Sequence, residues 1–186
     1  MKNLSKFLHS FPGVALITLL ILAIPLIAMQ FTNEVNWSVS DFVLMGVLIF
    51  ITGMLYVLVS RYAPNMLYRG GYLVAIGTTF IMIWANLAVG LIGSGPNLGN
   101  LMYVGVIAIV LIGAMLARFK QVSMEAVMYI SALSLVVHTA IALFAGLQSL
   151  PGSSITEIIG VNGFFIMLYV VGGLLFGHAK QNITAG

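Results

Sequence analysis

The sequence contains no cysteine and very few charged residues. Without a thiol, the chain can form no disulfide and offers no thiolate ligand and no cysteine nucleophile. Only 6% of its residues are charged, whereas soluble domains carry about 25%. So few charges cannot cover a water-exposed surface, and the mean hydropathy of +1.15 points the same way. The composition therefore predicts a protein whose surface mostly faces lipid.

The sequence also lacks the patterns of the commonest enzyme chemistries. It has no phosphate-binding loop, no HExxH motif, no nucleophile elbow and no histidine cluster. The four acidic residues fall in loops or near the ends of apolar stretches, which leaves little for acid–base chemistry inside a membrane. We therefore expect no catalytic residue, no cofactor and no bound metal, and nothing points to nucleic acid as a partner.

Six stretches are long and apolar enough to cross the hydrocarbon core, which takes about 20 residues of helix. They are separated by short connectors that carry glycine, proline or other turn-forming residues. Their expected bounds are 12–30, 42–60, 71–93, 101–117, 124–147 and 158–177. The sequence thus predicts an all-α fold, a polytopic membrane protein built as a six-helix transmembrane bundle. We expect 1–186 to form a single transmembrane domain.

The basic residues predict the orientation of this bundle. All seven fall on the same side of the expected membrane, namely Lys2, Lys6, Arg61, Arg69, Arg118, Lys120 and Lys180. Because connectors rich in lysine and arginine remain in the cytoplasm, we expect the N-terminus and the C-terminus to be cytoplasmic. The same residues suit anionic headgroups, so membrane lipids are expected partners.

The six stretches pair into three helical hairpins whose returning helices look alike. Matching glycines recur about 60 residues apart: Gly46 with Gly53, Gly105 with Gly113, and Gly163 with Gly172 and Gly173. Two interpretations stay open. Either three tandem hairpins form a pseudo-symmetric bundle, as in some transporters, or apolar helices that contain glycine simply resemble one another.

One ionisable side chain, that of His138, is expected deep inside the membrane. Asn86 is expected at a similar depth, with Trp84 and Thr139 at comparable levels. Because an ionisable group is costly in hydrocarbon, it is a functional candidate by default, and one interpretation is a pathway site for a proton, an ion or a small polar solute. The other, which is the commoner case, is an interhelical hydrogen bond worth about 0.6 kcal/mol.

The segment 84–103 is the most distinctive part of the sequence. It combines a tryptophan, asparagines, glycines and Pro96 across one hairpin, and Asn100 is a candidate N-cap for the fourth helix. The segment resembles part of an uncharacterised family of small bacterial polytopic inner-membrane proteins. The resemblance covers the third and fourth helices. It implies a bacterial cytoplasmic (inner) membrane, and it brings no activity and no site residue with it.

Small residues recur at four-residue spacing in the later helices: Gly113 with Ala117, Ala142 with Gly146, and Gly173 with Gly177. Such pairs let helix backbones approach closely. Because they are common in membrane helices, we expect them to serve packing within the chain rather than a dimer face.

Three classes of function remain on this evidence. A small-solute or ion transporter or channel is favoured by the six helices and by the level of His138 and Asn86. A non-catalytic subunit, assembly factor or scaffold of a larger membrane complex is favoured by the minimal loops and the glycine-rich helices. A lipid-modifying membrane enzyme comes last because catalytic groups are lacking. Copies of the chain itself, or other membrane subunits, are the expected protein partners.

Overall fold

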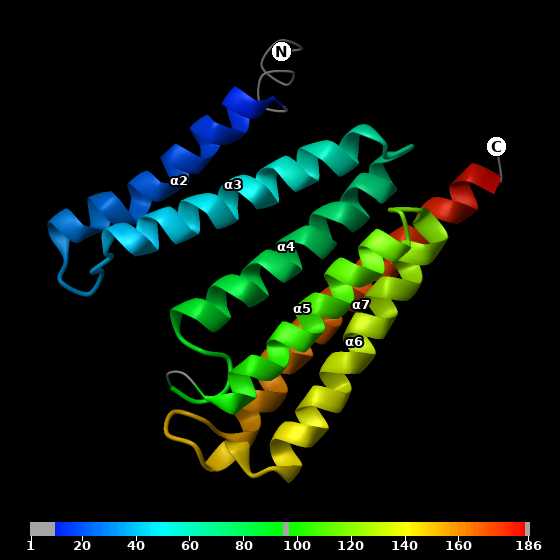
Figure 1. The fold of residues 1–186 in the computed structure, drawn as a ribbon. Helices are drawn as coiled ribbons and strands as arrows, with labels where there is room; N and C mark the ends of the chain where they lie inside the picture. The colour runs from blue at the N-terminus through cyan, green and yellow to red at the C-terminus, as the bar shows by residue number, and fades with distance from the viewer. Residues whose placement is uncertain (1–9, 95–96, 185–186) are drawn as a thin grey trace. The chain divides into compact units, whose positions relative to one another are not determined.

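The computed structural model describes residues 10–94 and 97–184, and for 121, 122 and 180–184 it describes the backbone alone. Within this described part every regular element is helical (Figure 1). Six helices, α2 to α7, are long and apolar enough to cross a membrane, and the short 3-10 helix η1 (Leu147–Ser149) lies between the last two. The predicted all-α fold is confirmed, and its six apolar helices are those of an integral membrane protein. The orientation stays a prediction.

The chain divides into two compact units, and the first, Met1–Tyr62, contains a helical hairpin. Its helices are α2 (Phe11–Phe31) and α3 (Val39–Arg61). Gly53 of α3 faces Val14 of α2 so closely that a Cβ added there would lie 2.8 Å from Cγ1 of the valine. The two helices therefore meet at a position where only glycine fits.

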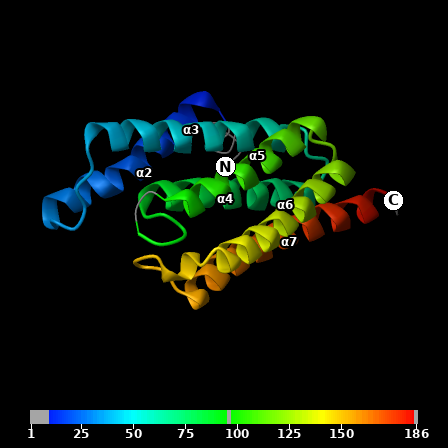
Figure 2. The same cartoon turned by 60° about the horizontal axis from the view of Figure 1, so that its bottom comes forward.

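The second unit, Ala63–Gly186, contains the other four helices: α4 (Met66–Ala88), α5 (Leu98–Leu116), α6 (Gln121–Phe144) and α7 (Ile155–Thr184). Helix α7 packs along both α6 and α4, and α5 packs mainly along α6; Figure 2 shows α6 and α7 side by side. Among the described residues, the largest fully buried side chains are all in this unit and include Tyr103, Tyr169 and Phe176. Whether 1–186 behaves as one domain stays a prediction.

Glycines bring the helices of the second unit together. A Cβ at Gly173 of α7 would lie 2.7 Å from the ring of Tyr129 on α6, and one at Gly113 of α5 would lie 2.9 Å from Val127. Both glycines thus pack inside the chain, as the sequence predicts. The two glycines do not make equivalent contacts. Gly113 on α5 faces α6, which belongs to the next hairpin, whereas Gly173 on α7 faces α6, its partner within the same hairpin. The threefold repeat stays a prediction.

Helix α4 is shifted by five residues from its expected bounds of 71–93 and spans Met66–Ala88. The Asn65 side chain caps its first turn by accepting a backbone N–H bond, so the helix begins on the tyrosine-rich segment. Gly90 and Gly93 have φ values of 81° and 63°. Because this left-handed backbone is open mainly to glycine, the helix ends before them.

The N-cap of α5 is Asn97, whose side chain accepts a hydrogen bond from the backbone N–H of Asn100. The expectation that Asn100 itself caps this helix was wrong. Its Oδ1 instead accepts hydrogen bonds from the backbone N–H groups of Leu91 and Ile92, at 2.8 and 2.9 Å. Through these two hydrogen bonds, Asn100 holds the α4–α5 connector against the first turn of α5.

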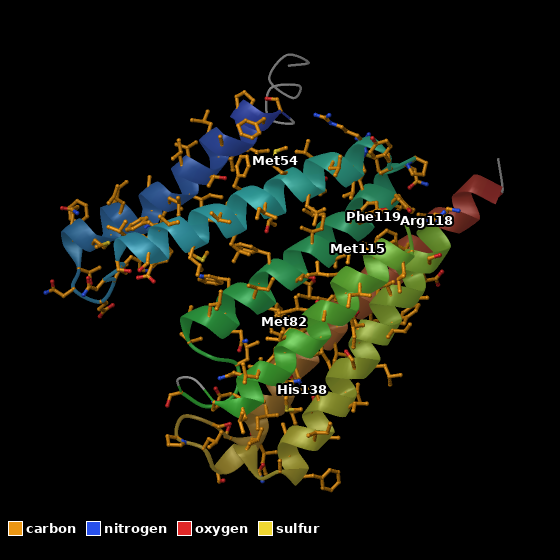
Figure 3. The ribbon with its side chains drawn as sticks, in the orientation of Figure 1. Met54, Met82, Met115, Arg118, Phe119 and His138 are labelled. Carbon is orange, nitrogen blue, oxygen red and sulfur yellow. The ribbon has the colours of Figure 1, made fainter. Side chains whose placement is uncertain are left out.

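Hydrogen bonds also fix the two ends of the second unit. At one end, the backbone N–H of Ser94 donates to the Pro151 carbonyl at 2.8 Å and joins two connectors. At the other end, the hydroxyls of Tyr68 and Tyr72 both donate to the Phe119 carbonyl at 2.6 Å. Phe119 has a positive φ of 54°, so its carbonyl lies in a tight left-handed turn between α5 and α6 (Figure 3).

Candidate functional site

His138 is buried in α6 and keeps only 3% of its surface exposed. Its ring packs against that of Tyr103 on α5, with 4.2 Å between the ring centroids and 41° between the planes. Neither ring nitrogen has a hydrogen-bond partner in the part of the chain that the structure describes. Figure 3 shows His138 in the half of the bundle away from Arg118 and Phe119.

A second buried polar side chain, Asn162 of α7, adjoins the same tyrosine. The Tyr103 hydroxyl donates a hydrogen bond to Oδ1 of Asn162 at 2.7 Å. Both side chains are fully buried. The Asn162 amide nitrogen, Nδ2, is also without a partner among the described residues. We call His138, Tyr103 and Asn162 the polar cluster.

The three members of the polar cluster come from three helices but lie at one level of the bundle. Tyr103 is five residues after the start of α5, His138 is six residues before the end of α6, and Asn162 is seven residues after the start of α7. At 1.5 Å per residue, each is about 8–10 Å from the same end. The cluster therefore lies within the membrane-spanning part of the helices.

The polar cluster offers hydrogen-bond donors and acceptors and contains no carboxylate, lysine or arginine. An uncharged imidazole has one donor and one acceptor nitrogen, and an amide nitrogen has two donor hydrogens. No hydrogen bond or ion pair between described residues connects the cluster to an acidic or basic side chain. Buried polar atoms without partners are rare in native proteins, so each one calls for an explanation.

Asn86 lies apart from this level because α4 ends only two residues later, at Ala88. Its Nδ2 donates to the backbone carbonyl of Asn100 at 3.1 Å, and its Oδ1 is buried without a partner among the described residues. The expected common depth of Asn86 and His138 rested on a helix that continued to 93. Asn86 instead belongs to the connector end of the bundle.

Trp84 and Thr139, the remaining two expected pathway residues, have no buried polar atom without a partner among the described residues. Trp84 is 41% exposed on α4. The Thr139 hydroxyl donates to the Leu135 carbonyl of its own helix at 2.7 Å. Neither makes a described contact with the polar cluster, so their roles in a pathway stay predictions.

Two cluster members, Tyr103 and Asn162, are absent from the sequence-based candidates. Asn162 could have been found, because it is a lone amide in an otherwise apolar stretch and meets the criterion that selected Asn86. Tyr103 gave no such signal, because a tyrosine near a helix end is usually an interfacial anchor. Its role follows only from the packing of α5 along α6 and from its hydrogen bond to Asn162 of α7.

The fold and the cluster define an integral membrane protein of six apolar helices with a buried polar cluster. Within the described part, no three His, Asp or Glu side chains come together as metal ligands would. No family model matches the chain, and no curated protein and no solved structure is significantly similar to it.

Proposed function

We propose that the chain transports a small, uncharged polar solute across its membrane, and that the polar cluster contacts this solute. The observation that carries the proposal is the set of unpartnered buried atoms: both ring nitrogens of His138 and Nδ2 of Asn162. A buried polar group without a hydrogen bond costs about 1–3 kcal/mol. A solute that supplied the missing bonds would recover part of that free energy.

The chemistry of the cluster favours an uncharged solute over an ion. A charged solute in an apolar interior needs an opposite charge or several aligned dipoles, and the cluster contains no carboxylate and no lysine or arginine. A molecule with both a donor and an acceptor, such as urea or glycerol, matches the free atoms of His138 and Asn162. We also propose that Asn86 lies along the route of this solute, at the connector end of the bundle.

The test is a permeability assay with the purified chain in liposomes, with urea and glycerol as the probes. We expect faster solute uptake than in protein-free vesicles, measured by light scattering after an osmotic jump. His138→Phe keeps a ring against Tyr103 but removes both nitrogens, and Asn162→Leu removes the amide. Each should slow uptake by about tenfold, the factor that 1.4 kcal/mol supplies.

The matched control is Ser134→Ala in the same helix as His138. The Ser134 hydroxyl donates to the Ser131 carbonyl in its own helix at 2.7 Å, outside the cluster. We expect this variant to behave like the original chain. If His138→Phe and Asn162→Leu keep the full permeability, or if the original chain adds none, the transport proposal is wrong.

A second candidate function is that of a subunit in a larger membrane complex. The observation in its favour is the sparse burial of α2, in which only Gly13, Val14 and Thr18 of 21 residues are buried. Its remaining apolar surface is available to lipid or to another helix. Gentle extraction followed by native mass spectrometry tests it: unrelated polypeptides in fixed ratio would support the subunit, and a chain found alone would contradict it.

A further inference from the structure

The polar cluster is closed off from solvent, because both ring nitrogens of His138 and Nδ2 of Asn162 are buried. A solute can therefore meet these atoms only after some part of their surroundings moves. The side chains that cover the cluster differ between its two sides, and this difference indicates which part moves at the lowest cost.

On the side toward Phe119, large apolar side chains of the helices themselves cover the cluster. Val106, Leu135 and Phe165 each lie three residues from a cluster member, which is one turn along the same helix face. Met82 of α4 lies on the same side of the cluster (Figure 3). All four are at most 3% exposed. To open this side, membrane-spanning helices would have to separate.

On the connector side, two of the corresponding helix positions carry small residues. Gly99 and Ala142 each lie four residues from a cluster member, again one turn along the same face, and Ile158 occupies the third such position, on α7. The space beside Gly99 is filled by Ile92, a fully buried residue of the connector after α4. A Cβ added at Gly99 would lie 3.5 Å from Cγ2 of Ile92. A connector residue thus packs where a helix side chain would otherwise lie.

Asparagine side chains, not helix backbone, hold Leu91 and Ile92 in place. Oδ1 of Asn100 accepts hydrogen bonds from both of their N–H groups. The Ile92 carbonyl accepts from Nδ2 of Asn97 at 2.7 Å and from Nδ2 of Asn100 at 3.2 Å. Water can take over such bonds once the segment is exposed, so each adds only modestly to the free energy that holds it. We call Leu91 and Ile92 the plug.

Two glycines with left-handed backbone flank the plug, Gly90 with a φ of 81° and Gly93 with a φ of 63°. Because glycine adopts left- and right-handed backbone about equally well, such positions can absorb the dihedral changes of a hinge. We propose that the plug closes the connector end of the bundle and swings outward on Gly90 and Gly93, so that the solute reaches the polar cluster past it. The identity of what passes rests on the transport proposal, whereas the movement is testable without transport.

A cysteine inside the cluster can report this movement, because the chain has none of its own. Asn162→Cys replaces a fully buried side chain. Its reaction with a small, water-soluble methanethiosulfonate is followed by mass spectrometry in detergent micelles, where both ends of the bundle face water. Adding Ile92→Ala shortens the plug and should speed this reaction about tenfold, the factor that 1.4 kcal/mol supplies.

Leu135→Ala in the same Asn162→Cys chain is the matched control. Leu135 is as deeply buried as Ile92, but it covers the side of the cluster toward Phe119, so its truncation should leave the rate unchanged. An unchanged rate with Ile92→Ala, or an equal increase with both variants, would overturn the plug.

A disulfide that ties down the outer end of the plug tests the segment at full size. Ser94 follows the plug, and its Cβ lies 3.4 Å from a Cβ added at Gly152 in the α6–α7 connector, close to the roughly 3.5–4.5 Å between the Cβ atoms of a disulfide. Oxidation of the Ser94→Cys/Gly152→Cys chain should slow urea uptake into liposomes about tenfold, and a reductant should restore it. The chain with Ser94→Cys alone should respond to neither treatment.

The two measurements separate the plug from the transport proposal. If the oxidised chain, with its disulfide verified by mass, takes up urea as fast as the reduced chain, the plug is wrong. If no form of the chain speeds uptake, the transport proposal fails, and the reaction rate at position 162 then decides whether the plug moves.

Discussion

The hydroxyl of Tyr103 donates a hydrogen bond to Oδ1 of Asn162 over 2.7 Å and joins α5 to α7 inside the bundle. Because both side chains are fully buried, removing one leaves the other with an unpaired polar atom. The bond also orients the amide so that Nδ2 is left for another partner. This pair is therefore both a structural contact and the part of the polar cluster that fixes its geometry.

Tyr103→Phe and Asn162→Leu should each lower the free energy of unfolding by about 1–3 kcal/mol, because each leaves a buried polar atom unpaired. The double variant should lose less than the two single losses together, by about 0.6–1.7 kcal/mol, the size of such bonds in membrane proteins. A double-mutant cycle of unfolding in mixed micelles measures this coupling. Strictly additive losses would show that the bond contributes nothing.

Gly113→Ala should destabilise the second unit by about 1–3 kcal/mol through overpacking. The new Cβ would lie 2.9 Å from Cγ1 of Val127, and a β-branched side chain has little freedom to turn away. Gly105→Ala in the same helix is the control, because a Cβ there meets nothing within 4 Å. Thermal unfolding in detergent compares the two, and equal midpoints would contradict the close contact at Gly113.

The two tyrosines on the Phe119 carbonyl should substitute for each other. Tyr68→Phe or Tyr72→Phe alone leaves one hydroxyl on this carbonyl, so each should cost little. The double variant leaves the carbonyl without either, and we expect it to lose more stability than both single variants together, by about 1 kcal/mol or more. Tyr62→Phe, at a side chain that is 80% exposed, should change nothing. If the double variant loses no more stability than the two single variants together, the two tyrosines do not substitute for each other at the Phe119 carbonyl.

The orientation predicted from the basic residues can be tested with engineered thiols, since the chain has no cysteine of its own. Cysteines that replace Ser94 and Ser154, both exposed connector residues, should react in intact cells with a maleimide that cannot cross the membrane. One that replaces Pro64 should react only after the membrane is opened. Labelling of the Pro64 position from outside would invert the topology.

The lengths of the apolar stretches were enough to predict the number of helices. The exact ends of the helices depend on capping side chains and on glycines with a positive φ, which those lengths do not indicate. Helix α6 ends at Phe144 rather than at 147 because Gly146 adopts a φ of 74°. A glycine in an apolar stretch is compatible with helix and with turn alike, so its conformation follows from the surrounding contacts. For the same reason the sequence alone could not show that α4 ends before Gly90.

The candidate site was predictable only in part, because a cluster is a property of packing between helices. His138 stood out by chemistry alone, as the one ionisable group expected deep in the membrane. Its neighbours depended on which faces of α5 and α7 turn inward, and apolar helices that are hydrophobic all round give no such signal. Asn86 was selected as an unusual polar group, and its depth was inferred from an expected helix end, 93, that lies five residues beyond the observed one.

The anchor at Phe119 has an evolutionary consequence. The two tyrosines bind a main-chain oxygen, which every residue type supplies, so these two hydrogen bonds leave the side chain at this position open to drift, although the Phe119 ring also lies 6.4 Å from that of Tyr72. The left-handed backbone at 119 restricts that drift, because glycine and asparagine tolerate it best. Among divergent descendants of this sequence, the tyrosine pair should persist opposite a variable position that turns most often to glycine or asparagine.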